Sequence, residues 1–343
     1  DEESEEVREL LKYDEETAGG IMTSDFVAVS ADMTAAQAIA HIGSLELEEP
    51  VYFAYVVSTT GHLQGYIQLW ELLKTTHLQQ PLSTLAVKDT ISVQTDTDQE
   101  EVARTASKYD LSSLPVLDLN GILVGRITVD DIIDVIEEEA SEDIFKLAGS
   151  SDSELEYSSP LHACKARLPW LMITLFAGFV SSLILKQFID HHIIALSFFV
   201  PIIMAMGGNT GIQSSTLIIR GLAVGSIDER GLSKLLLREL AAGALMGIMC
   251  GTIIGIWSVF MVGANSEIPA IYLAFTVGTS LFAAMTFAAV FGAFAPLVLN
   301  RLKADPAVAS GPFVTASNDI LALLIYYGVT VGLILLRTQL LGA

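Results

Sequence analysis

The sequence predicts an α+β front half built from two repeated modules, followed by an all-α polytopic membrane domain of five transmembrane helices. The first observation behind this division is charge: residues 1–159 carry 33 Asp or Glu against 8 Lys or Arg, a net charge of −25. Residues 160–343 carry 7 against 10, a net charge of +3, and only they contain bilayer-length apolar stretches. Because so acidic a surface repels nucleic acid and concentrates cations, we expect no nucleic-acid partner.

The front half contains an internal repeat with a spacing of about sixty residues. Each copy reads as an apolar strand, a glycine turn, a second strand and then a helix. The matching segments are Tyr55-Val56-Val57, Gly61 and Gly65 against Pro115-Val116-Leu117, Gly121 and Gly125, with helices from near Leu69 and Val129. Each copy extends backwards to a further strand at Asp25–Val29 or Asp89–Val93 and a helix at Thr34–Ile42 or Gln99–Tyr109.

This arrangement resembles a tandem pair of CBS modules, which implies an α+β fold and binding of ATP or another adenine nucleotide between the modules. The second copy has Gly125-x-x-Thr128-x-x-Asp131, which is similar to the CBS pattern whose Thr and Asp contact phosphate or ribose. The first copy has Gln68 and Glu71 at the corresponding positions, so we expect at most one nucleotide site. The alternative is that Thr128 caps a helix and Asp131 favours its positive end.

An acidic connecting helix is predicted from Asp130 to Lys146, where acids occupy most positions between the apolar ones. Like charges four residues apart cost about 0.2–0.5 kcal/mol per pair unless something neutralises them. A divalent cation would do so, and the alternative is a solvated acidic face. The like-charge pairs are Asp130/Asp134, Asp134/Glu138, Glu138/Glu142 and Glu139/Asp143.

The back half contains five apolar stretches, each close to or above the length of a transmembrane helix. They run approximately over Leu168–Leu185, Ile193–Ile219, Leu240–Val262, Ile268–Leu299 and Gly311–Leu336. Basic residues gather on one side and favour the cytoplasm, which predicts cytoplasmic front modules and an external C-terminus. The eight on that side are Lys165, Arg167, Arg220, Arg230, Lys234, Arg238, Arg301 and Lys303, against Lys186 and Arg337 on the other.

Asp319 is the only carboxylate well inside one of these five stretches. A charge inside a membrane is costly and marks ion pathways, so Asp319 points to cation transport. In the second stretch, Gly207, Gly208 and Asn209 are expected to weaken the helix and free carbonyls for a hydrated cation. The alternative is close helix packing through small residues.

Taken together, these motifs resemble the MgtE family of magnesium channels. The matching segments are Thr128–Asp131, Gly207–Ser214, Leu217–Arg220, Asp305-Pro306-Ala307, Asp319 and Leu323–Tyr326. The chain departs from the family pattern at Gly311, where Asn is common, and at Leu321 and Ala322, where Thr-Gly is common. The family's superhelical N-terminal domain is absent from these 343 residues.

The resemblance implies a homodimeric, multi-pass plasma-membrane channel that imports Mg²⁺ and is closed by cytoplasmic Mg²⁺. It implies ion binding in the pore at Asp319, Gly207, Gly208 and Asn209, and a regulatory metal set of Glu100, Asp110, Asp131, Asp134, Glu139, Glu142, Asp143 and Asp305. The expected organisation is an acidic lead-in (1–20), two CBS modules (21–80 and 81–129), the connecting helix (130–160) and the five-helix pore domain (161–343).

Other classes are weighed against this interpretation. A proton- or sodium-coupled secondary transporter is compatible with a carboxylate in a broken-helix membrane domain, and a nucleotide sensor with a membrane anchor would need fewer spans. An enzyme is not expected, because the sequence has no Walker loop, no Gly-x-Ser-x-Gly and no His-Glu-x-x-His pattern.

Overall fold

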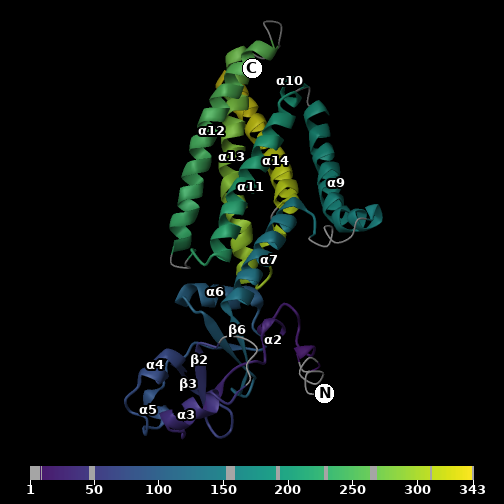
Figure 1. The fold of residues 1–343 in the computed structure, drawn as a ribbon. Coiled ribbons are helices and arrows are strands. Elements are labelled where there is room, and N and C mark those ends of the chain that lie inside the picture. Colours follow the sequence, from purple (N-terminus) through teal and green to yellow (C-terminus); the bar gives the residue numbers. More distant parts are fainter. Residues whose placement is uncertain are drawn as a thin grey trace. The chain divides into compact units, whose positions relative to one another are not determined.

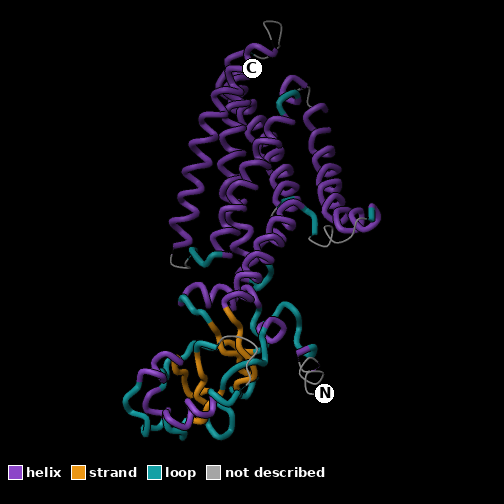
Figure 2. The backbone as a smooth tube through the Cα atoms, in the orientation of Figure 1, coloured by secondary structure: helices purple, strands orange, loops and turns teal. Residues whose placement is uncertain are grey.

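The computed structural model describes residues 8, 10–45, 51–151, 159–190, 194–227, 231–262, 269–309 and 311–341. The chain divides into two compact units, Asp1–Ala140 and Ser141–Ala343. Helix α7 (Val129–Ala148) begins in the first unit and ends in the second (Figure 1). The described strands all lie in the first unit, and the described part of the second unit contains helices joined by loops and turns (Figure 2).

The first unit contains two three-stranded sheets of the same design. One consists of β1 (Ala28–Ser30), β2 (Phe53–Val57) and β3 (Leu63–Gln68), and the other of β4 (Val93–Gln94), β5 (Ser113–Leu117) and β6 (Leu123–Thr128). In each sheet the first pair of strands is parallel and the second is antiparallel.

The register of the two sheets confirms the internal repeat. Phe53 pairs with Gln68 as Ser113 pairs with Thr128, and a register shift follows Val56 in one copy and Val116 in the other. The turn glycines have φ angles of 83° and 82° at Gly61 and Gly121. Residues other than glycine rarely adopt these positive φ angles, which explains the glycine at each turn.

The described helices of the first unit include α2 (Ala18–Ile21), α3 (Ala35–Ile42), α4 (Leu69–Lys74), α5 (Leu82–Leu85), α6 (Gln99–Tyr109) and the start of α7. Helix α3 begins at a capping box, in which Thr34 and Gln37 satisfy each other's backbone groups. The Asp98 carboxylate accepts from the Glu100 N–H and starts α6. The predicted helices at 34–42, 99–109 and 130–146 are confirmed.

Each module has its own apolar core, and the second core includes residues from the start of the chain. Val27, Val56 and Ile67 belong to the first core, whereas Ala18 lies in the second. The Ala18 N–H donates to the Thr97 carbonyl at 2.7 Å. The segment around α2 therefore packs with the second module, and the domain boundaries expected from the sequence stay predictions.

The described part of the second unit contains long helices and two short ones. They are α9 (Pro160–Asp190), α10 (Ile194–Ser197), α11 (Val200–Ala223), α12 (Leu232–Val262), α13 (Ala270–Arg301), η2 (Pro306–Ala309) and α14 (Pro312–Leu341). Four described helices are long and apolar enough to cross a membrane, namely α9, α12, α13 and α14. Helix α11 is 24 residues long but is not among them, so five spans are not confirmed.

Helix α11 runs without interruption through its glycine-rich segment, Gly207–Gly211. The expectation that these glycines break the helix was therefore wrong, and the interruption lies earlier, between α10 and α11. Gly207, Gly208 and Gly211 are all buried, because α11 packs closely on α13 and α14. Helix packing through small residues explains this segment.

Candidate ion-binding residues

The Asp319 carboxylate of α14 lies directly against the glycine segment of α11. A methyl group on Gly208 would lie 3.1 Å from Oδ1 of Asp319, so any larger residue at 208 would crowd the carboxylate. A methyl group on Gly207 would lie 3.0 Å from Cβ of Ala322. The two glycines therefore let the polar turn of α14 approach the α11 backbone, while Asn209 lies on the exposed face of α11.

Asn318, next to Asp319, fills the same notch in α11. A methyl group on Gly211 would lie 2.8 Å from Cγ of Asn318. The side chain is 1% exposed, and neither Oδ1 nor Nδ2 has a hydrogen-bond partner among the described residues. An unpaired buried amide is costly, so this part of the α11–α14 contact is polar rather than a plain apolar seam.

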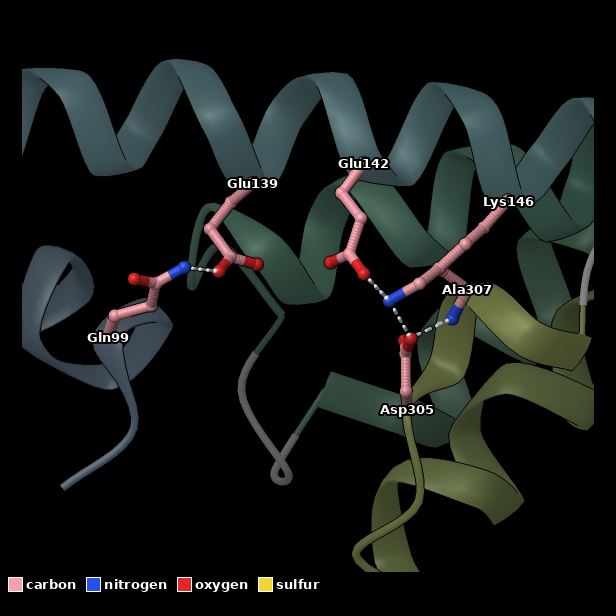
Figure 3. A network of polar contacts seen from close by, with 6 residues as sticks. All are labelled: Gln99, Glu139, Glu142, Lys146, Asp305 and Ala307. Carbon is pink, nitrogen blue, oxygen red and sulfur yellow. Dashed lines mark hydrogen bonds and ion pairs between the residues drawn. The ribbon is translucent and has the colours of Figure 1, made fainter. Parts of the chain in front are cut away.

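A second cluster joins the end of α7 to the turn before α14 (Figure 3). The Lys146 ammonium donates to Oδ2 of Asp305 at 2.7 Å and pairs with Glu142, one helical turn away. The other Asp305 oxygen accepts from the Ala307 N–H at 2.7 Å. Burial lowers the pKa of Lys146, but its bonds to Asp305 and Glu142 outweigh burial and raise that pKa, so the ammonium stays charged.

Two other acids of the expected regulatory set have separate partners within the first unit. Glu139 accepts from Nε2 of Gln99 at 2.7 Å (Figure 3), and Glu100 pairs with Arg104 at 3.3 Å. Asp110 ends α6 in the left-handed conformation. Asp134 is exposed, and Asp143 lies in the second unit.

The acids of the expected regulatory set are divided between the two units of the chain. Among the described residues, no group of three or more His, Cys, Asp or Glu side chains could hold a metal ion. The structure does bring Glu142 and Asp305 onto one cation, the Lys146 ammonium. Carboxylate oxygens are the ligands that Mg²⁺ prefers, so the donor chemistry of these two residues suits that ion.

Two family models and several curated proteins are similar to this chain. A family model described as "MgtE: Divalent cation transporter" matches residues 200–329, and a CBS domain model matches residues 82–138. The magnesium transporter MgtE of Thermus thermophilus is 39% identical over 329 residues, covering 94% of this chain and 71% of that protein. The Bacillus subtilis magnesium transporter MgtE is 36% identical over 335 residues, covering 97% and 73%.

This chain belongs to the MgtE family. It is a multi-pass membrane protein of a family of magnesium transporters, not an enzyme. Two solved structures are also similar: the soluble part of a magnesium transporter, and the cytosolic domain of the Mg²⁺ channel MgtE in complex with ATP. They share 40% and 38% identity over 40% and 39% of this chain and cover 54% and 55% of their own chains, with TM-scores of 0.38 and 0.37.

The residues expected to bind nucleotide in this MgtE chain are engaged with other protein groups. The Thr128 N–H donates to Oδ2 of Asp131 at 3.1 Å, and the Thr128 hydroxyl donates to the same oxygen. A methyl group on Gly125 would lie 2.9 Å from Cγ of Met22. These contacts fit the helix-capping alternative for Thr128 and Asp131.

A separate cleft of about 350 Å³ opens between the two modules of the first unit. Three aromatic rings line it, together with polar and acidic groups. These residues include Phe53, Tyr66, Tyr109, Gln68, Asp89 and Asp110. Rings suit an adenine base, whereas the two carboxylates disfavour a bare phosphate.

Sequence reasoning missed a second buried acid of this MgtE chain, Glu239. It lies within α12, is 5% exposed and accepts from the Ser214 hydroxyl at 2.9 Å. Glu239 lies one residue before the third apolar stretch, Leu240–Val262, so Asp319 is still the only carboxylate well inside the five stretches. The apolar run of the sequence begins at Leu240, but α12 begins two turns earlier at Leu232, so Glu239 lies inside the helix.

Proposed function

We propose that this chain forms a magnesium-selective channel that imports Mg²⁺ and closes when cytoplasmic Mg²⁺ binds to the CBS modules and α7. The observation that carries the transport part is the Asp319 carboxylate, held in a span against the buried backbone of Gly208. Mg²⁺ gives up its water reluctantly, so a carboxylate beside a helix backbone suits a hydrated ion held through its water shell.

A homodimer would complete this site. Two-fold symmetry places the same residue of each subunit on both sides of the axis, so two Asp319 carboxylates would face one ion. The orientation follows from the basic residues on one side of the membrane. An impermeant thiol reagent should therefore label the exposed Cys164 only from the cytoplasmic side; labelling from outside would reverse the orientation.

Flux through reconstituted protein tests the role of Asp319. The full chain in liposomes should carry Mg²⁺ into the vesicles, and both Asp319→Ala and Asp319→Asn should reduce that flux at least tenfold. Asp32→Asn, which neutralises an exposed acid of the first unit, is the matched control. Equal flux in all four proteins would remove Asp319 from the pathway, and flux that requires an opposing sodium or proton gradient would favour a coupled transporter.

Closure by Mg²⁺ follows from the charge of α7. Bound cations would neutralise its like-charge pairs, and they bias the pore shut only if they prefer the closed state. We expect the quadruple variant Asp134→Asn, Glu139→Gln, Glu142→Gln and Asp143→Asn to conduct at internal Mg²⁺ concentrations that stop the wild type. Inhibition that is unchanged in this variant would reject the regulatory role of α7.

An adenine nucleotide, ATP or another, is the proposed second ligand of the first unit. Two places compete for it: the pattern Gly125, Thr128 and Asp131, and the aromatic cleft around Tyr109. Titration of the full chain with Mg²⁺-ATP separates them. Tyr109→Ala should weaken binding if the cleft is used, whereas Thr128→Val should do so if the pattern is used, and no binding to the wild type would exclude both.

A further inference from the structure

Lys146 is placed between two carboxylates that come from distant parts of the chain. Its ammonium contacts Oδ2 of Asp305 at 2.7 Å and the carboxylate of Glu142, and its side chain is 26% exposed (Figure 3). The lysine thus provides the positive charge that this carboxylate pair needs, without any added ion.

The cluster lies where the end of α7 meets the start of α14. Asp305 also holds the Ala307 N–H and so fixes η2, the turn before α14. A methyl group on Gly149 would lie 2.8 Å from Cγ of Pro312, and one on Gly311 would lie 3.0 Å from the carbonyl carbon of Leu147. The backbone that follows Lys146 therefore packs directly on the first turn of the helix that carries Asp319.

We propose that Lys146 is a tethered counter-ion that competes with the regulatory divalent cation for Glu142 and Asp305. This inference rests on the proposed closure by Mg²⁺ at α7, and on the expected regulatory set, which contains both Glu142 and Asp305. A cation that binds both carboxylates must take the place of the ammonium, because both occupy the same short space between the same oxygens. Lys146 then sets the Mg²⁺ concentration at which the cluster fills.

Competition predicts that removing the Lys146 ammonium strengthens metal binding. Without the ammonium, Glu142 and Asp305 repel each other and gain more from a divalent ion, so metal binding strengthens. If Lys146 instead acted only as a strut that holds α7 against η2, its removal would weaken closure and raise the Mg²⁺ requirement. The competing role lowers the Mg²⁺ concentration needed for closure when Lys146 is removed, whereas the strut role raises it.

The test uses Lys146→Met, which keeps the length of the chain, and Lys146→Gln, which keeps a polar end. Lys303→Met is the matched control, because it removes one positive charge two residues from Asp305. In liposomes, both Lys146 variants should be half-inhibited at about three- to tenfold lower cytoplasmic Mg²⁺ than the wild type, and the control should change less than twofold. In an Asp305→Asn background, Lys146→Met should no longer shift the Mg²⁺ concentration of half-inhibition, since the two residues share one site.

A binding measurement on the full chain in detergent separates this proposal from the gating proposal. Mn²⁺ titration followed by electron paramagnetic resonance should show that both Lys146 variants reach half-saturation at a lower Mn²⁺ concentration than the wild type. If wild-type flux is insensitive to Mg²⁺ but the Mn²⁺ shift is present, the gating proposal fails and the competition stands. Unchanged or weaker Mn²⁺ binding in both variants, or no Mn²⁺ binding in any protein, would overturn the role of Lys146.

Discussion

The close approach of α11 and α13 predicts a large steric effect from one added methyl group. A Cβ on Gly292 would lie 2.8 Å from Cα of Gly211 and closer still to its carbonyl oxygen. Ordinary contacts of this kind begin at 3.4 Å, so Gly292→Ala must separate two backbones by at least about 0.6 Å. Neither partner is a side chain that can rotate away.

The expected cost follows from two opposing terms. Overpacking costs about 1–3 kcal/mol, whereas replacing glycine by alanine inside a helix gains up to about 1 kcal/mol. Gly178→Ala in α9 is the matched control, because nothing lies within 4 Å of the added methyl group there. The control keeps the helix-propensity gain and removes the clash, so the difference between the two variants isolates the steric term of about 1–3 kcal/mol.

Thermal unfolding of the purified protein in detergent measures this difference. For a unit of this size, 1 kcal/mol corresponds to about 2–4 °C, so Gly292→Ala should unfold about 2–12 °C below Gly178→Ala. Flux should fall as well, because the shift of α11 moves Gly208 relative to Asp319. Equal unfolding temperatures for the two variants would refute the close α11–α13 contact.

Two further predictions concern hydrogen bonds to carboxylates. Ser214→Ala removes a donor from the buried Glu239 carboxylate and should lower the free energy of unfolding by about 1–3 kcal/mol, measured by denaturant unfolding in micelles. Ser182→Ala, an exposed hydroxyl bonded within its own helix, should change it by less than about 0.5 kcal/mol, and equal effects would contradict the reasoning. Several hydrogen bonds, of which that from the Ile122 N–H is the strongest, hold the pKa of Asp118 below its usual 3.8. The stability that this carboxylate adds is therefore present above that pH and lost as the pH falls. The unfolding-temperature difference between wild type and Asp118→Asn should therefore shrink between about pH 6 and about pH 3, and a constant difference would count against it.

Local patterns in the sequence predicted the first unit well. The repeat was visible because Gly61 and Gly121 occupy turns that need a positive φ, and such positions strongly favour glycine. The helices expected over Thr34–Ile42 and Gln99–Tyr109 likewise correspond to α3 and α6. Asp319 was found because an acid in a long apolar run is rare.

The features that the sequence did not predict depend mainly on contacts between residues far apart in the chain. The glycines of α11 indicated a broken helix, but packing on α13 and α14 keeps the helix intact, and nothing local reports that packing. Glu239 lies just before the apolar run that begins at Leu240, so the sequence placed it outside the predicted span. The contact of Lys146 with Asp305 joins residues 159 positions apart, a pairing that one sequence does not reveal.

The central claim is that Asp319 holds Mg²⁺ in the transport pathway. An experimental structure of the full chain with Mn²⁺ in place of Mg²⁺ tests it directly, because anomalous scattering locates the metal. The account predicts a peak on the two-fold axis between the two Asp319 carboxylates, lost in Asp319→Asn. Metal peaks elsewhere in the helical unit, with none beside Asp319, would contradict it.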